Sequence, residues 1–223
     1  MVKSLTRISS AGEDLESLAH RAYMAIRDRI ICLELPPGAV LSEAALADSR
    51  GLSRTPIREA LKRLESDYLI AIMPRRGIIV TDVDLRDQLL LLDVRRGIES
   101  ALFARAAERS SPAQRRRFQE LVEEMEFTAG NNDLQRHYVL DREFDTLIDT
   151  CAGNRFLTDM LRPVHCLVWR FWQTQRETEG ALQVLEHQLV VTRAAAAGAP
   201  ARVLAATRAL FDFNERYIRK LLG

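Results

Sequence analysis

Three basic side chains recur every four residues in segment 53–66, a spacing that suits DNA binding. Arg54, Arg58 and Lys62 share one face of a helix, because four residues take little more than one helical turn. Phosphates attract such a face, and an arginine can donate two hydrogen bonds to O6 and N7 of guanine. The spacing predicts a helix that enters the major groove of double-stranded DNA. A solvated basic face is the alternative interpretation.

Two neighbouring groups extend this pattern. The hydroxyl of Thr55, near the positively polarised start of the helix, can hydrogen-bond a phosphate. Farther along, Arg75 and Arg76 precede Gly77 at the expected tip of a hairpin, from which arginines reach a minor groove or the DNA backbone. Gly77 allows the tight turn that such a tip needs.

The basic residues are concentrated locally. The 223-residue chain carries 32 Lys and Arg against 31 Asp and Glu, a net charge of +1. Segment 50–76 alone has seven basic and three acidic residues, a net charge of +4. This distribution excludes a uniformly basic nucleic-acid coat and favours one local DNA-binding patch.

The elements that must hold this patch form a winged helix-turn-helix in residues 1–81. A first helix ends before Pro36, a short helix is capped by Ser42, and Gly51 turns the chain into the basic helix. Its apolar stripe consists of Ile57, Leu61 and Leu64. The β-branched runs 69–72 and 77–81 then predict a β-hairpin.

Residues 82–223 are expected to be entirely helical. Apolar periodicity predicts a helix over about 85–109, and Ser111-Pro112 with Gln114 is a start signal for the next. Further helices are expected over about 132–151, 155–177, 179–197 and 200–222. The predicted fold is therefore mainly α, a winged domain followed by an antiparallel bundle of six or seven helices.

Three motifs resemble the winged-helix domain of the GntR family of bacterial transcription regulators, and the helical remainder is similar to the FadR-like branch with an FCD effector-binding domain. The motifs are Pro37-Gly38-x-x-Leu41-Ser42-Glu43-x-x-Leu46-Ala47, Gly51-Leu52-Ser53-Arg54-Thr55-Pro56-Ile57-Arg58-Glu59-Ala60-Leu61-x-Arg63-Leu64-Glu65 and Pro74-Arg75-Arg76-Gly77-x-x-Val80. One departure is Tyr68, where the family usually has the glycine that ends the recognition helix.

The resemblance implies a homodimer that binds a palindromic operator and responds to a small metabolite, expected to be a carboxylate. It is not the pattern of an enzyme. The DNA-binding residues expected from the spacing and the resemblance together are Ser53, Arg54, Thr55, Pro56, Arg58, Lys62, Arg75, Arg76 and Gly77.

The resemblance also implies one divalent metal ion in the helical domain. Asp141 matches the family's first ligand, Asp145 stands where the second is usually His, and His187 follows Glu186 in the third motif. Near the fourth position the chain has Leu210, Phe211 and Asn214 in place of His. Two carboxylates and one imidazole would favour a harder ion than zinc. A pocket without metal, with His187 as a hydrogen-bonded core residue, is the alternative.

Arg95 matches an arginine that meets an acidic effector in the family, so the expected effector-binding residues are Arg95, Asp141 and His187. An ion pair of Arg95 with Glu99, four residues on, remains the alternative. Trp169 and Trp172 are expected in the core. His137 and His165 match no family position and are expected to be structural.

Other functions are less well supported by the residues. No run of eighteen apolar residues and no apolar leader is present, and Cys32, Cys151 and Cys166 form no zinc motif. These features favour a cytoplasmic protein. The alternative function is a metal-dependent enzyme using Asp141, Asp145 and His187. A winged helix that binds a protein partner would not need the basic face.

Overall fold

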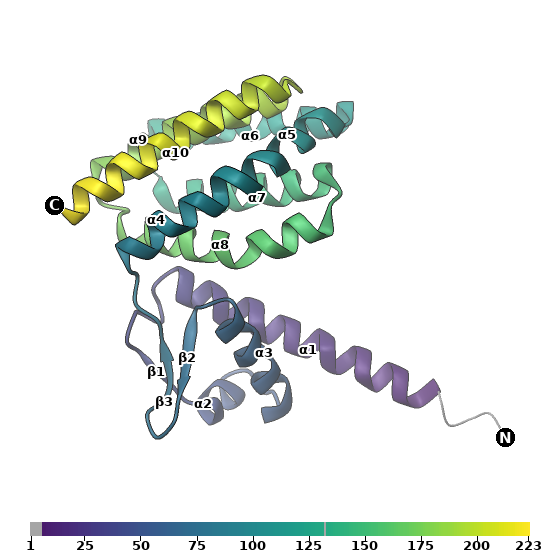
Figure 1. Ribbon diagram of the computed structural model, residues 1–223. Coiled ribbons are helices and arrows are strands. Elements are labelled where there is room, and N and C mark those ends of the chain that lie inside the picture. Colours follow the sequence, from purple (N-terminus) through teal and green to yellow (C-terminus); the bar gives the residue numbers. More distant parts are fainter. Residues whose placement is uncertain (1–5, 132) are drawn as a thin grey trace. The chain divides into compact units, whose positions relative to one another are not determined.

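The computed structural model describes residues 6–131 and 133–223, and the chain divides into two compact units, Met1–Val83 and Asp84–Gly223. The first unit combines helices with one small sheet, and the second is built from helices (Figure 1). The predicted mainly-α fold is confirmed. No helix of the described residues is both long enough and apolar enough to cross a membrane.

Three helices build the Met1–Val83 unit: α1 (Thr6–Ile31), α2 (Glu43–Asp48) and α3 (Arg54–Ser66). Ser42 caps α2 as expected, its hydroxyl accepting a hydrogen bond from the Ala45 amide. Helix α1 packs along α3. The buried Tyr23 on α1 donates its hydroxyl to Asp67, which directly follows α3, at 2.5 Å. These contacts fix the inner side of α3 and leave its opposite face to solvent.

The sheet of this unit is antiparallel in the order β1-β3-β2. Its strands are β1 (Val40–Leu41), β2 (Ile70–Met73) and β3 (Gly77–Val80). The hairpin of β2 and β3 was predicted, with Met73 opposite Gly77 at its tip. The two-residue strand β1 was not predicted, because it is too short to show a period in the sequence.

Tyr68 ends α3 in a left-handed backbone conformation, with φ +60°. Its amide donates to the Glu65 carbonyl and the Leu69 amide to the Leu64 carbonyl, the two bonds of a Schellman motif. Leu64 and Leu69 are both fully buried, as the motif prefers. The side chain of Tyr68 is 67% exposed. The chain therefore places an exposed tyrosine where the backbone favours glycine.

Replacing Tyr68 with glycine should stabilise the protein. A left-handed residue with a side chain costs roughly 1–2 kcal/mol, and little packing is lost because the ring is exposed. Allowing for the greater freedom of glycine in the unfolded chain, Tyr68→Gly should raise the free energy of unfolding by about 1 kcal/mol in denaturant titrations. Tyr68→Ala keeps the strain and is the control. Equal stability of the two variants would contradict a backbone origin.

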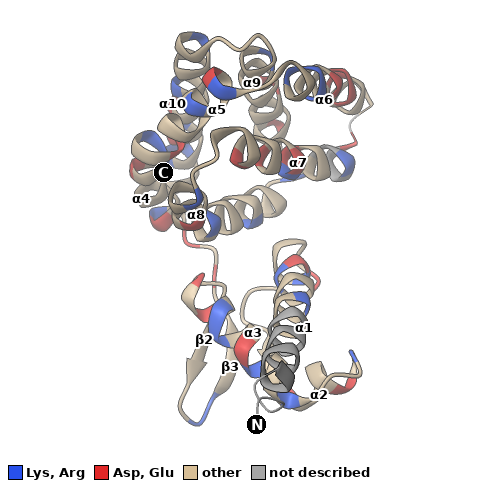
Figure 2. Cartoon of the chain, turned by 90° about the vertical axis from the view of Figure 1, so that its right-hand side faces the viewer, with Lys and Arg blue, Asp and Glu red and all other residues tan. Residues whose placement is uncertain are grey.

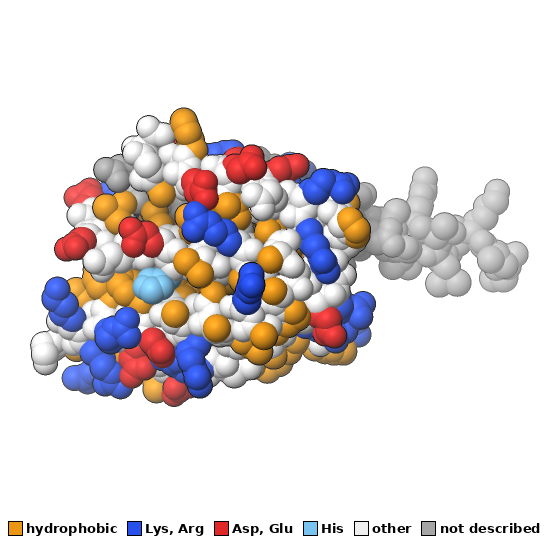
Figure 3. All heavy atoms as spheres, turned by 90° about the horizontal axis from the view of Figure 1, so that it is seen from above, with side chains coloured by type: hydrophobic (Ala, Val, Ile, Leu, Met, Phe, Trp, Pro, Cys, Tyr) orange, Lys and Arg blue, Asp and Glu red, His pale blue; other side chains and the backbone are white. Residues whose placement is uncertain are grey.

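The Asp84–Gly223 unit contains α4 (Leu85–Val94), η1 (Arg95–Glu99), α5 (Ser100–Arg109), α6 (Pro112–Gly130), α7 (Leu134–Ala152), α8 (Arg155–Thr174), α9 (Glu179–Ala196) and α10 (Pro200–Leu222). Phe144 is central to its core, with edge-on contacts to Phe103 and Phe118 at 5.4 and 5.8 Å between ring centres. Ser111 and Gln114 form the predicted capping box. The face shown in Figure 3 mixes charges of both signs with apolar side chains.

The helix predicted over residues 85–109 contains a π-helical turn, η1, that the sequence did not predict. Residues on either side keep α-helical geometry, so α4, η1 and α5 follow one another without a loop. The turn places Arg95 and Glu99, both charged, inside the unit. Single π-helical turns often occur at functional sites, because they redirect side chains relative to the helix around them.

Candidate functional site

Five exposed basic side chains form what we call the basic surface: Arg54, Arg58, Lys62, Arg75 and Arg76. The first three lie on α3, whose opposite face buries Ile57 and Leu64 completely. The other two lie at the tip of the β2–β3 hairpin, where Figure 2 shows basic residues. Both predicted groups are thus presented to solvent by the same unit.

The start of α3 is open to a ligand. Ser53 is its N-cap residue but makes no capping hydrogen bond with its side chain. Both Ser53 and Thr55 are exposed next to the unpaired amides of the first turn. Pro56, by contrast, is buried, because the first helical turn packs it inward. Burial leaves little of this side chain available to DNA, and its contact with DNA stays a prediction.

Arg58 is held by an ion pair across the helix-turn-helix. Its Nε atom lies 2.7 Å from Oε1 of Glu43, the first residue of α2. The side chain of Arg58 remains 63% exposed. The carboxylate therefore restrains the guanidinium beside α2 while leaving much of it accessible. Lys62 is paired more loosely with Glu59 on the same helix, at 2.9 Å.

The hairpin tip projects its arginines from a strained turn. Arg75 follows Pro74 with φ +65°, and the Arg76 amide donates to the Met73 carbonyl. A positive φ two residues into such a turn normally calls for glycine or asparagine. Gly77, with φ +86°, then begins β3. An arginine kept in a left-handed conformation at an exposed tip suggests that its charge has a use.

In the Asp84–Gly223 unit, Arg95 is bound by Glu99. The guanidinium donates from Nε and NH2 to the two carboxylate oxygens, at 2.6 and 3.1 Å, and both side chains are buried. It also lies 4.7 Å from the centre of the Phe211 ring. Of the two interpretations of Arg95, the structure shows the pair with Glu99. The guanidinium fork that would grip a carboxylate ligand is already occupied.

Asp141 and Asp145, one turn apart on α7, complete what we call the acidic cluster: Glu99, Asp141 and Asp145 around Arg95. Burial raises the pKa of Asp141 to about 6, opposed by Arg95 and by a hydrogen bond from Trp169. The pKa of Asp145 rises well above its ordinary value through burial and repulsion by Asp141 and Glu99. One guanidinium thus faces several carboxylates that repel one another.

His165 on α8 lies against this cluster and is not merely a core histidine. Its Nδ1 is 3.6 Å from Oδ2 of Asp145, and its Nε2 is 3.9 Å from Oε2 of Glu99. Both distances exceed a hydrogen bond, and the buried Nε2 has no partner among the described residues. Burial lowers the pKa of His165, Glu99 partly opposes this, and Arg95 adds to the lowering. The imidazole is therefore neutral near pH 7.

His187 does not join Asp141 and Asp145 as expected. It is half-buried, its ring packs on Phe213 at 4.9 Å, and its pKa is lowered by burial and then by Arg216. On α9 the neighbouring Gln188 is the buried residue. Val191 and Ala194, which were predicted to share its face, are buried as well, so His187 lies at the edge of the buried face of α9. That His187 shares an effector site with Arg95 and Asp141 stays a prediction.

The expected metal-ligand set of Asp141, Asp145 and His187 is consequently not assembled. No group of three or more His, Cys, Asp or Glu within the described part of the chain is placed to hold a metal ion. Asn214, near the missing fourth ligand, is buried, and its Oδ1 has no partner there. The side chain of His137 lies outside the described residues. The divalent metal remains a prediction, which thermal unfolding with and without EDTA tests.

Asp141→Asn should stabilise the protein near neutral pH and change little in acid. Below pH 3.8, the ordinary pKa, the carboxyl is protonated in both the folded and unfolded chains. Between pH 3.8 and about 6, Asp141 loses its proton more readily in the unfolded chain than in the folded one. The free energy of unfolding of the wild type therefore falls over this range. The shift of the Asp141 pKa from 3.8 to about 6 corresponds to about 3 kcal/mol in the free energy of unfolding. Denaturant titrations at pH 4 and 7.5 measure it. The exposed Asp159→Asn is the control, and a gain independent of pH would contradict the mechanism.

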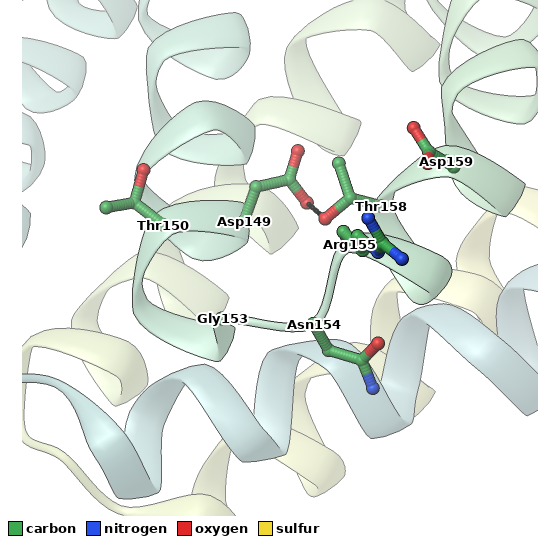
Figure 4. A pocket seen from close by; sticks show the side chains of 7 residues that line it. All are labelled: Asp149, Thr150, Gly153, Asn154, Arg155, Thr158 and Asp159. Carbon is green, nitrogen blue, oxygen red and sulfur yellow. Dashed lines mark hydrogen bonds between the residues drawn. The ribbon is translucent and has the colours of Figure 1, made fainter.

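A hollow of about 500 Å³ opens at the turn between α7 and α8. Figure 4 shows the side chains around it, with Asp149 accepting a hydrogen bond from Thr158 at 2.8 Å. Asp149 is one turn beyond Asp145 on α7, and its charge contributes to the raised pKa of Asp145. Asp159 is a second acidic residue at the rim. The row of carboxylates on α7 therefore continues from the acidic cluster to this hollow.

Comparison with known families agrees with this architecture. The model of the bacterial regulatory proteins of the gntR family matches residues 18–80. The model of the FCD domain matches residues 90–213, more than half of the chain. The first range contains α3 and the hairpin, and the second contains the acidic cluster.

Individual relatives are also transcription regulators. An uncharacterised helix-turn-helix regulator of Agrobacterium vitis is 32% identical over 66% of this chain and 84% of its own length. The transcriptional repressor RspR of Escherichia coli is 28% identical over 65% and 63%. The structure of E. coli McbR/YncC shares the fold, with TM-score 0.78 and 21% identity over 92% and 99%. The chain is therefore a regulator and not an enzyme, and it belongs to the GntR family of DNA-binding transcription regulators, in the branch that carries an FCD domain.

Proposed function

We propose that a homodimer of this protein binds a palindromic operator through the basic surface, and that a small molecule in the FCD domain controls this binding. The observation that carries the proposal is the two-sided character of α3. It buries Ile57, Leu61 and Leu64 and exposes Arg54, Arg58 and Lys62. A helix anchored on one side and basic on the other suits the major groove.

Dimerisation is proposed from the size of the DNA-binding unit. One winged domain buries little surface on DNA, so a second half-site is needed for the affinity of a typical regulator. Two copies related by a twofold axis would read a palindrome. A protein that binds DNA in this way would work in the cytoplasm, and the odd number of widely spaced cysteines in the sequence suits that reducing compartment.

Control by a small molecule is proposed from the FCD domain. Its interior holds several charged side chains around Arg95, which a domain serving only as a scaffold would not need. Buried charged side chains favour a conformation of the domain in which opposite charges compensate them. A ligand that compensates them would stabilise one arrangement of the domain and shift its population.

A selection experiment tests the DNA-binding part. The protein would be used to enrich duplexes from a random library, and affinity for the enriched sequence measured between 50 and 200 mM salt. We expect a palindromic consensus and a steep linear fall of log affinity with log salt, because each neutralised phosphate contributes about −0.9 to the slope. Light scattering should give a dimer. No enriched sequence, a flat salt dependence or a monomer would reject the proposal.

A further inference from the structure

We propose that the acidic cluster of the FCD domain binds a small organic cation bearing N–H groups, a primary ammonium or a guanidinium compound, as the effector. This inference rests on the proposed effector control and names the chemical class of the ligand. It replaces the carboxylate expected from the sequence. Charge, an unpartnered imidazole nitrogen and the shape of the helix around it support the proposal.

Charge is the first support. The charged groups acting on Asp145 are Asp141, Glu99 and Asp149, which are acidic, and Arg95, which is basic. Arg95 is already committed to Glu99 by two hydrogen bonds. The raised pKa of Asp145 means that without a ligand a bound proton compensates part of this negative charge, and a cationic ligand would take the place of that proton. A carboxylate ligand would instead meet several like charges.

The second support is independent of charge and comes from His165. Its side chain is 9% exposed, and Nε2 is buried without a hydrogen-bond partner in the described parts of the chain. Nε2 points towards Glu99 Oε2 at 3.9 Å, which is too long for a direct bond. A nitrogen with two N–H groups, about 2.9 Å from each atom, would bridge them.

The tautomer of His165 fits the same ligand. When a bound cation keeps Asp145 ionised, its carboxylate, 3.6 Å from Nδ1, favours the proton of the neutral ring on Nδ1. Nε2 then carries a lone pair and accepts hydrogen bonds. Both groups on either side of the gap, Nε2 and the Glu99 carboxylate, are therefore acceptors. They require a donor, and a cationic N–H donor also supplies the missing charge.

The surroundings are those of a binding site rather than of a plain core. The π-helical turn η1 directs Arg95 and Glu99 inward. Trp169, one turn from His165 on α8, donates to Asp141 and lies 5.7 Å from the imidazole. An indole ring beside carboxylates is a favourable neighbour for a cation. Asp149, one turn beyond Asp145 on α7, lines the hollow shown in Figure 4 together with Asp159 on α8.

Thermal unfolding of the full-length protein tests the proposal with putrescine and agmatine as probes, at constant ionic strength. Tetramethylammonium has charge but no N–H group, and succinate represents the carboxylates. We expect putrescine or agmatine to raise the unfolding temperature by about 5 °C at a hundredfold excess over Kd. Tetramethylammonium and succinate should give no shift beyond that of sodium chloride.

Two variants locate the effect. Asp145→Asn removes a carboxyl that would ionise when a cation binds, and His165→Phe removes the acceptor Nε2 while keeping a flat ring. Each should abolish the amine-dependent shift. Glu123→Gln, an exposed acidic residue on α6, should keep it. Should either cluster variant fail to fold, the other carries the test. The same amine should change the affinity for the selected operator in the wild type and not in the variants.

Several results would overturn the inference: no shift with either amine, an equal shift with tetramethylammonium, a shift with magnesium, manganese or succinate alone, or an amine shift that survives Asp145→Asn and His165→Phe. Each of these leaves DNA binding to be measured in its own right. Loss of operator binding in the absence of amine would instead reject the proposed function. The two failures are therefore distinguishable.

Discussion

Arg58→Ala is expected to weaken binding to the selected operator by roughly 5- to 150-fold, corresponding to about 1–3 kcal/mol for one base contact. Arg54→Ala should have an effect of similar size. Both arginines are exposed on the face of α3 opposite its buried stripe. Affinity measured by fluorescence anisotropy, with the wild-type duplex and with a substituted half-site, reports both strength and specificity.

Glu43 makes the Arg58 result more specific. Its carboxylate lies 2.7 Å from the guanidinium, so Arg58→Ala leaves an uncompensated negative charge beside the proposed DNA surface. Arg58→Ala with Glu43→Gln should therefore recover part of the affinity lost in the single variant. Arg208→Ala, an exposed arginine on α10, is the control for a general loss of charge. Unchanged operator binding in both α3 variants would remove this helix from the interface.

The winged unit was largely predictable from the sequence because its signals are local. The period of Ile57, Leu61 and Leu64 sets the buried face of α3, and the positions of the arginines follow from it. Turn residues and β-branched runs then define the hairpin. Strand β1 and the burial of Pro56 were not predicted, because both depend on which parts of the unit pack against them.

The interior of the FCD domain was less predictable, because its site depends on helix phase and on residues far apart in sequence. On α9 the neighbouring Gln188 is buried while His187 is half-buried, at the edge of the inward face, and this difference does not follow from the apolar pattern alone. The π-helical turn changes the phase between α4 and α5. His165 was expected to be structural, because no spacing in the sequence connects it to Asp145 or Glu99. The usable signals were two spacings of four residues, Arg95–Glu99 and Asp141–Asp145.

Arg95→Ala should be the most destabilising single change in the FCD domain, by about 3–5 kcal/mol. The guanidinium is the cation bound to Glu99, and it also lowers the pKa of both Asp141 and Asp145. Removing one partner of a buried ion pair leaves the other charged and without compensation. Denaturant titration of the full-length protein measures the loss, which should grow between pH 5 and 8 as the remaining carboxyls ionise.

A second substitution shows whether Arg95→Ala loses stability through charge compensation or through packing. Glu99→Gln in the Arg95→Ala background removes the carboxylate that Arg95 held, so the double variant should regain much of the lost stability. Arg95→Lys should be intermediate, because an ammonium keeps the charge but cannot donate from two planar nitrogens to both oxygens of Glu99. If Arg95 acted only by packing on Phe211, Glu99→Gln would add its own cost and Arg95→Lys would be no better than alanine. Rescue in the double variant therefore identifies charge compensation as what holds this interior together, the same requirement that a cationic effector would meet.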